Sequence, residues 1–219
     1  MRIFHELTRK PWLTAQEAVV DLHTSAGFAL PSAKLALRMF LAVVTVLFML
    51  LIIAYGSRME FEDWRPSPPL QLLWLNTALL VLGSLGMQRA QIGARRGQRD
   101  QVTVGLLAGG AFAFAFLGGQ LLAWRELQAM TVFDISNPAI AFFYMITGLH
   151  GLHLLGGLVA WGRTAVKLWR GFGAGELRLS VELCTVYWHF LLAVWLVLFG
   201  LLFSGNDNLG ILLSICGIR

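Results

Sequence analysis

The sequence predicts an all-α integral membrane protein built as a bundle of five transmembrane helices. Two features of its composition indicate this class: 57% of the 219 residues are hydrophobic and only 13% are charged, whereas a soluble domain carries about 25% charged residues. The mean hydropathy is +0.69. In addition, apolar runs of roughly the 20 residues needed to cross a bilayer recur along the chain. So few charges cannot cover a surface that faces water on all sides.

Five apolar segments are expected to span the membrane, and they lie at residues 35–55, 70–87, 102–124, 139–161 and 183–203. The connectors between them carry residues that break helices, such as the prolines within 66–69 and Gly97. Asn137-Pro138 opens the fourth segment in the way that helices often begin, with a capping side chain followed by a proline in the first turn. The segments are therefore bounded by local signals as well as by hydropathy.

Charged residues sort between the connectors in a way that predicts the orientation of the bundle. The N-terminal 38 residues and the second and fourth connectors are net basic, whereas the first and third connectors are net acidic. The bases of the second and fourth connectors are Arg89, Arg95, Arg96, Arg99, Arg163, Lys167, Arg170 and Arg178. Because cytoplasmic loops are enriched in Lys and Arg, the N-terminus is predicted to be cytoplasmic and the C-terminus to lie outside. The net charge of +5 thus reflects membrane topology, and no nucleic-acid partner is expected.

These predictions divide the chain into three parts. Residues 1–34 are expected to form a cytoplasmic N-terminal arm, residues 35–204 the five-helix transmembrane domain, and residues 205–219 a short external tail. The arm mixes apolar and basic residues, which suits a segment lying on a membrane surface or on a partner. A partly ordered polar tail explains the same composition equally well.

Small residues in the third segment predict close helix packing. Gly105 and Gly109 form a GxxxG pair, and small residues continue at every fourth position through Ala111, Ala115, Gly119 and Ala123. Such faces let helix backbones approach each other in lipid. They indicate packing and carry no information about activity.

Histidines inside two of the spans are the strongest functional signal. His150 and His153 lie in the fourth segment, and His189 lies in the fifth. Polar side chains are costly in hydrocarbon, so histidines there need a partner or a function. Three interpretations are open: ligands to a haem or metal, part of a proton or transport path, or hydrogen-bonded contacts between helices or subunits.

The residue pattern favours the third interpretation. A haem held by two histidines needs ligands at matched depth, but His150 is mid-span while His189 lies only about two turns into its helix. A transport path usually carries embedded carboxylates, and the first three spans offer only uncharged polar groups such as Asn76 and Gln120. From the residues alone we therefore expect these histidines to be contacts between helices or subunits rather than a catalytic, haem or metal site.

Two motifs resemble a known family. Residues 142–153, followed by Gly156-Gly157, resemble the penultimate helix of the cytochrome c oxidase subunit III family, and the run from Glu182 to Trp195 resembles its last helix at the same spacing. Weaker matches extend the resemblance over about residues 38–204. The positions carried over as structural, subunit-contact or lipid-contact candidates are Asn76, Gln120, Gly148, His150, Gly151, His153, Glu182, Tyr187, Trp188, His189 and Trp195.

The resemblance implies an accessory subunit and not an enzyme in its own right. Members of the family hold no haem or copper, which belong to subunits I and II, the expected partners. They stabilise subunit I, carry phospholipid and support proton uptake. The five-helix form is bacterial, so the expected location is the bacterial plasma membrane. Alternatives are an accessory protein of nitric oxide reductase from the same superfamily and, from different classes, a small b-type cytochrome or a transporter.

Three positions depart from the family pattern. Many members carry acids where this chain has Val44, Asn76 and Leu192. A role that depends on those carboxylates is therefore in doubt for this chain, whereas packing and lipid roles are less affected.

Overall fold

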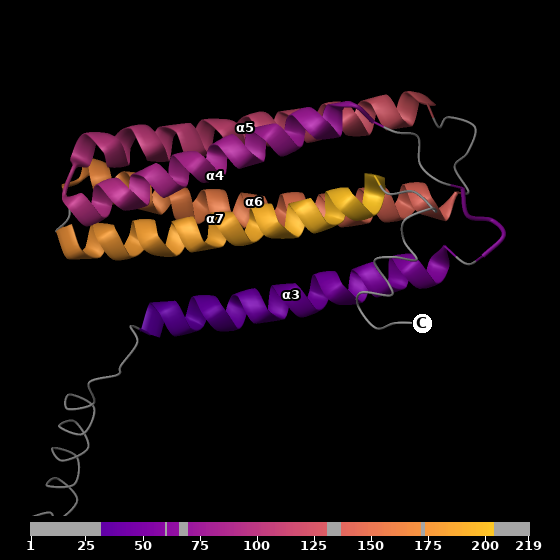
Figure 1. Cartoon of the computed structure of the whole chain (residues 1–219), viewed down its shortest axis with the longest axis horizontal. Coiled ribbons are helices and arrows are strands. Elements are labelled where there is room, and N and C mark those ends of the chain that lie inside the picture. Colours follow the sequence, from indigo (N-terminus) through magenta and orange to yellow (C-terminus); the bar gives the residue numbers. More distant parts are fainter. Residues whose placement is uncertain (1–31, 60, 66–69, 131–136, 172–173, 204–219) are drawn as a thin grey trace, which may run out of the picture. The chain divides into compact units, whose positions relative to one another are not determined.

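The computed structural model describes residues 32–59, 61–65, 70–130, 137–171 and 174–203. These residues form five helices: α3 (Ser32–Arg58), α4 (Leu72–Arg96), α5 (Arg99–Met130), α6 (Pro138–Trp169) and α7 (Ala174–Phe203) (Figure 1). The all-α prediction is confirmed. The expected external tail lies outside the described residues, as does the expected arm except for residues 32–34, which begin α3.

The helices extend beyond the apolar segments. The helix α6 continues to Trp169 although its apolar segment ends at residue 161, and α7 begins at Ala174 although its segment begins at 183. Only the second segment starts before its helix, because Leu70 and Gln71 precede α4. Hydropathy marks the part of a helix that suits hydrocarbon, but helical hydrogen bonding continues into the polar ends.

By length and composition, α3, α5, α6 and α7 can each cross a membrane. The 25-residue helix α4 is less hydrophobic than these four and is not among the helices apolar enough to cross a membrane. Polar residues such as Asn76, Gln88 and Arg89 interrupt its hydrophobic sequence. Four such helices define a multi-pass membrane protein.

The chain divides into two compact units, residues 1–39 and 40–219, and the bundle belongs to the second. Within it α4 and α5 share the most extensive helix–helix contact, and α7 packs against both α4 and α6 (Figure 1). A Cβ atom added to Gly105 would fall 2.6 Å from both the Ala90 nitrogen and the Gly86 oxygen. The two backbones are therefore in contact at the predicted GxxxG pair. Ala111 and Ala115 are exposed, so the rest of the predicted small-residue stripe does not form one packing face.

The part of α3 that belongs to the second unit packs through side chains and not through close backbones. Its buried residues Val44, Phe48 and Tyr55 join a core cluster with Ile146 of α6 and Leu198 of α7. Most other α3 side chains are exposed. This helix consequently presents a wide apolar surface to whatever surrounds the bundle.

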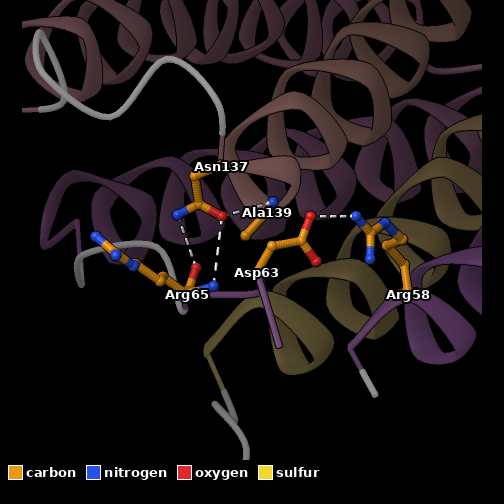
Figure 2. Close-up of polar contacts among 5 residues, drawn as sticks. All are labelled: Arg58, Asp63, Arg65, Asn137 and Ala139. Atoms are coloured by element: carbon orange, nitrogen blue, oxygen red, sulfur yellow. Dashed lines mark hydrogen bonds and ion pairs between the residues drawn. The ribbon is translucent and has the colours of Figure 1, made fainter. Parts of the chain in front are cut away.

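One asparagine fixes the start of α6. The side-chain oxygen of Asn137 accepts a hydrogen bond from the Ala139 amide at 3.0 Å, and its side-chain nitrogen donates to the Arg65 carbonyl at 2.9 Å (Figure 2). The predicted Asn-Pro helix start is confirmed. The same residue ties the segment that follows α3 to α6, which the sequence pattern does not reveal.

Candidate functional site

Polar side chains from two helices meet inside the bundle. Asn76 of α4 is completely buried and donates a hydrogen bond from its side-chain nitrogen to the Gln120 side-chain oxygen of α5 at 3.3 Å. Gly119 makes this possible, because a Cβ there would lie 2.1 Å from the Asn76 side-chain oxygen. Two uncharged amides satisfy part of each other's bonding capacity, which is how polar groups are tolerated between membrane helices.

His150 lies in an aromatic enclosure near this pair. Its side chain is fully buried, with ring centroids 5.0 Å from Trp195 and 5.8 Å from Phe116. Neither ring nitrogen has a hydrogen-bond partner among the described residues. Trp195, also fully buried, donates from its indole nitrogen to the Thr77 hydroxyl at 3.0 Å. The imidazole is thus placed by packing against aromatic side chains of α5 and α7, and Thr77 of α4 in turn bonds to Trp195.

The other two histidines of the predicted spans bond to their own helices. The His153 Nδ1 lies 2.8 Å from the Leu149 carbonyl, and the His189 Nδ1 lies 2.8 Å from the Thr185 carbonyl. His153 is half-buried, and its ring centroid lies 5.4 Å from that of Phe48 on α3. His189 is exposed on α7. The three histidines therefore occupy different environments and do not share one site.

Tyr187 and Trp188 connect α7 to its neighbours. The Tyr187 hydroxyl donates to the His153 carbonyl at 2.8 Å, and a Cβ at Gly157 would lie 2.8 Å from the Tyr187 ring. Trp188 is buried against Gly83 and Gly157. These contacts hold α6 and α7 together in the part of the chain where the two family-like motifs face each other.

The remaining predicted positions are less constrained. Added Cβ atoms at Gly148 and Gly151 would make ordinary contacts, at 3.6 Å from the Trp124 ring and 3.9 Å from a Leu117 methyl carbon. Neither glycine is therefore required by close packing within this chain. Glu182 is half-buried on α7.

Several interhelical hydrogen bonds involve residues that the sequence analysis did not single out. Trp161 donates to the Leu106 carbonyl at 2.8 Å, and Trp124 donates to the Thr147 hydroxyl at 3.0 Å. Thr185 donates to the Met87 carbonyl at 3.2 Å. A tryptophan near the end of a span has the same sequence signature whether it faces lipid headgroups or a neighbouring helix, so hydropathy could not separate the two.

Of the positions where the resemblance led us to expect acids, Val44 has apolar surroundings. Val44 is 2% exposed and packs in the core cluster of α3, α6 and α7. Leu192 is half-buried on α7. An isolated carboxylate at Val44 would be strongly disfavoured there, so this substitution agrees with the packing around it.

An apolar groove lies between α3 and α6. It has a volume of about 710 Å³, and its lining contains only aliphatic and methionine side chains: Ala42, Val43, Val46, Leu47, Leu50, Leu51, Ala54, Met145 and Leu149. Nothing in the lining offers a charge or a hydrogen-bonding side chain. Such a groove suits an extended hydrocarbon chain better than a polar substrate.

Among the described residues, no group of three or more histidine, cysteine or acidic side chains is arranged to hold a metal ion. Buried polar groups such as Asn76 and Gln120 lie between helices, and the groove between α3 and α6 is apolar. These features define a helical membrane protein in which several buried polar residues join one helix to another. Its sequence places it more narrowly: the profile described as "Cytochrome c oxidase subunit III" matches residues 33–205, so the chain belongs to that family.

Individual relatives agree with this assignment. The chain is 31% identical over 176 residues to "Cytochrome c oxidase subunit 3" of Synechocystis sp., a match that covers 75% of this chain and 72% of the relative. It is 29% identical over 158 residues to "Probable cytochrome c oxidase subunit 3" of Mycobacterium tuberculosis, covering 68% and 75%. A 128-residue match of 30% identity to "Heme-copper oxidase subunit I+III" of Aeropyrum pernix covers 58% of this chain and 16% of that longer protein.

Proposed function

We propose that this chain is the non-catalytic subunit III of a bacterial haem–copper terminal oxidase of the cytochrome c oxidase type. The observation that carries the proposal is the family match over residues 33–205. The fused subunit I+III protein of Aeropyrum pernix, in which the two names occur on one polypeptide, supports subunit I as the direct partner. Oxygen reduction and its metals then belong to subunits I and II, and this chain stabilises subunit I and supports its proton uptake.

The proposed topology has five spans in the bacterial plasma membrane, with the N-terminus in the cytoplasm and the C-terminus outside. The turn between α4 and α5 and the turn between α6 and α7 both carry basic residues, which favours placing both on the cytoplasmic side. The helix α4 then crosses with Asn76 shielded against Gln120. Pairing its most polar interior residue with another helix makes a weakly apolar span acceptable in a membrane.

The proposed lipid role rests on the groove between α3 and α6. Its wholly apolar lining and volume of about 710 Å³ suit the acyl chains of phospholipid held at the edge of the bundle. Lipid in this groove would cover side chains of α3 that the rest of the chain leaves exposed.

The surroundings of His150 argue against a cytochrome in this chain alone. A haem ligand must direct a ring nitrogen at an open position, but His150 is fully enclosed by the bundle, with Trp195 and Phe116 beside its ring. Haem binding there would require the removal of buried aromatic side chains. We therefore propose that haem and copper are found only in the partner subunits.

The experiment that tests the proposed function is affinity purification of the tagged chain in a mild detergent, with optical spectra of the complex and of the chain purified alone. We expect large membrane subunits with haem to co-purify and the isolated chain to be colourless. Peptide sequencing of those subunits separates an oxidase from a nitric oxide reductase. A Soret band in the isolated chain would refute the accessory role and favour a cytochrome, and transport activity of the chain alone in vesicles would favour a transporter.

A further inference from the structure

We propose a second, separate lipid site: a groove beside the α4–α5 turn binds the phosphodiester of an anionic glycerophospholipid, with Arg89 as its principal contact. This groove has a volume of about 410 Å³ and is lined by Arg89, Asp100, Gln101, Val104 and Gly105. It lies on different helices from the apolar groove of α3 and α6, and unlike that groove it contains charged side chains. The inference rests on the proposed membrane topology.

The position of Arg89 is the first reason. It lies about 10 Å along the helix axis before α4 ends at Arg96, at about 1.5 Å per residue. Because Arg89 comes just after the apolar segment 70–87, the proposed topology places its guanidinium at the cytoplasmic membrane interface, at the level of the lipid phosphates. Within the described parts of the chain, Arg89 has no hydrogen bond or ion pair. Its donors are therefore free for a phosphate, which guanidinium binds through two parallel hydrogen bonds.

The surrounding charge is the second reason. Exposed arginines 95, 96 and 99 lie at the same turn, and Asp100 is the nearby acid. Clusters of bases at a cytoplasmic membrane surface attract anionic lipids, with about 1 kcal/mol for each Lys or Arg. A zwitterionic lipid gains much less from such a field, so the charge favours an anionic headgroup.

The shape of the groove is the third reason. Its floor is rigid, because added Cβ atoms at Gly93 and Gly105 would lie only 2.8 Å from the Gln101 Cβ and 2.6 Å from the Ala90 nitrogen. The two helices touch there and cannot close the groove further. Val104 lines the groove and is 64% exposed, and Leu107, one turn further along α5, is 52% exposed. A headgroup beside Arg89 can thus lay an acyl chain on an apolar surface that continues into the membrane.

The test uses the purified complex after its lipids have been removed. Phosphatidylglycerol or phosphatidylcholine with the same acyl chains is then added, and native mass spectrometry measures how much of each lipid binds. The variant is Arg89→Gln, and the matched control is Arg163→Gln, which removes an exposed arginine of α6 and changes the net charge equally. We expect Arg89→Gln to weaken phosphatidylglycerol binding by at least about fivefold, the factor that corresponds to about 1 kcal/mol. Arg163→Gln should leave it within about twofold.

A second variant acts in the opposite direction. Asp100→Asn removes the carboxylate from the groove without removing a base, so it should strengthen phosphatidylglycerol binding. Equal losses in Arg89→Gln and Arg163→Gln would overturn the proposal in favour of diffuse surface charge. Equal binding of the two lipids, or binding of inorganic phosphate in place of lipid, would also overturn it. Haem-bearing partners that still co-purify with Arg89→Gln keep the proposed function separate from this result.

Discussion

Asp63 shows how a single exposed residue is coupled to the end of α3. Its carboxylate accepts a hydrogen bond from Arg58, and this bond holds the pKa of Asp63 below its ordinary value of 3.8. Arg58 also lies over the Phe61 ring, 4.6 Å from its centroid. The ion pair joins the end of α3 to the segment after it, in which Arg65 bonds to Asn137 (Figure 2).

The lowered pKa gives a prediction with a definite sign. A carboxyl group whose pKa is lower in the folded state stabilises that state above its unfolded pKa, and this contribution is lost as the pH falls through the folded value. We expect the unfolding temperature of the wild type to exceed that of Asp63→Asn by a small margin at neutral pH. The margin should shrink below about pH 3.8. A margin that grows on acidification, or an Asp63 that titrates above 3.8, would contradict this account.

At the same scale, the sequence predicted which residues would be unusual but not how they are satisfied. The histidines were expected to make hydrogen bonds between helices or subunits. His150 is instead fully buried with no hydrogen-bond partner among the described residues, and His153 and His189 bond to carbonyls of their own helices. The Asn76–Gln120 pair could not be predicted, because each amide stands alone in its own helix and only the approach of α4 to α5 brings them together. The hydrogen bonds of Trp124 and Trp161 could not be predicted for the same reason, because each acceptor lies on another helix.

At the scale of elements, the close contact between α4 and α5 depends on glycine, which has no side chain, at position 105. Around Gly105 the neighbouring atoms are the Ala90 nitrogen and the Gly86 oxygen, which belong to the backbone and cannot rotate away. Gly118, on the same helix, has no neighbouring atom within 4 Å of an added Cβ. The two glycines therefore separate the effect of helix packing from the general effect of a larger side chain.

We predict that Gly105→Leu destabilises the bundle by about 1–3 kcal/mol or more, because overpacking forces the backbones apart. Gly118→Leu should change stability by no more than about 0.5 kcal/mol, as expected for a surface position. Both can be measured as the denaturant dependence of helix content in the detergent-solubilised chain. Equal effects of the two substitutions would show that the close approach of α4 and α5 does not hold the bundle together.

Helix existence and order followed from the sequence because hydropathy and the Asn-Pro start are local signals. Helix ends did not, since α6 and α7 continue well past their apolar segments. The groove between α3 and α6 also escaped prediction. It depends on the distance between two helices, and a hydrophobic side chain has the same sequence signal whether it faces a neighbour, a groove or lipid.

At the scale of the whole molecule, the exposed His189 indicates where a partner subunit contacts the chain. Its Nδ1–H donates to the Thr185 carbonyl of its own helix, which leaves Nε2 as an acceptor on the surface of α7. Hydrocarbon offers no donor to this nitrogen, and an unsatisfied polar atom in lipid is costly. Under the proposed function, a donor from a partner subunit is the natural complement, so His189 should act on assembly more than on the fold of the chain.

We therefore predict that His189→Ala leaves the thermal stability of the isolated chain nearly unchanged but lowers the recovery of haem-bearing partners by at least about fivefold. That factor is the lower end of the roughly 1–3 kcal/mol lost when a buried group keeps no partner. The matched control is Val186→Ala, an exposed apolar residue on the same helix. Haem spectra of the complex that remains should be unaltered, because no ligand is removed. A less stable isolated chain with normal recovery of partners would instead assign His189 to the fold, and the exposed face of α7 would then have to be satisfied by lipid headgroups or water.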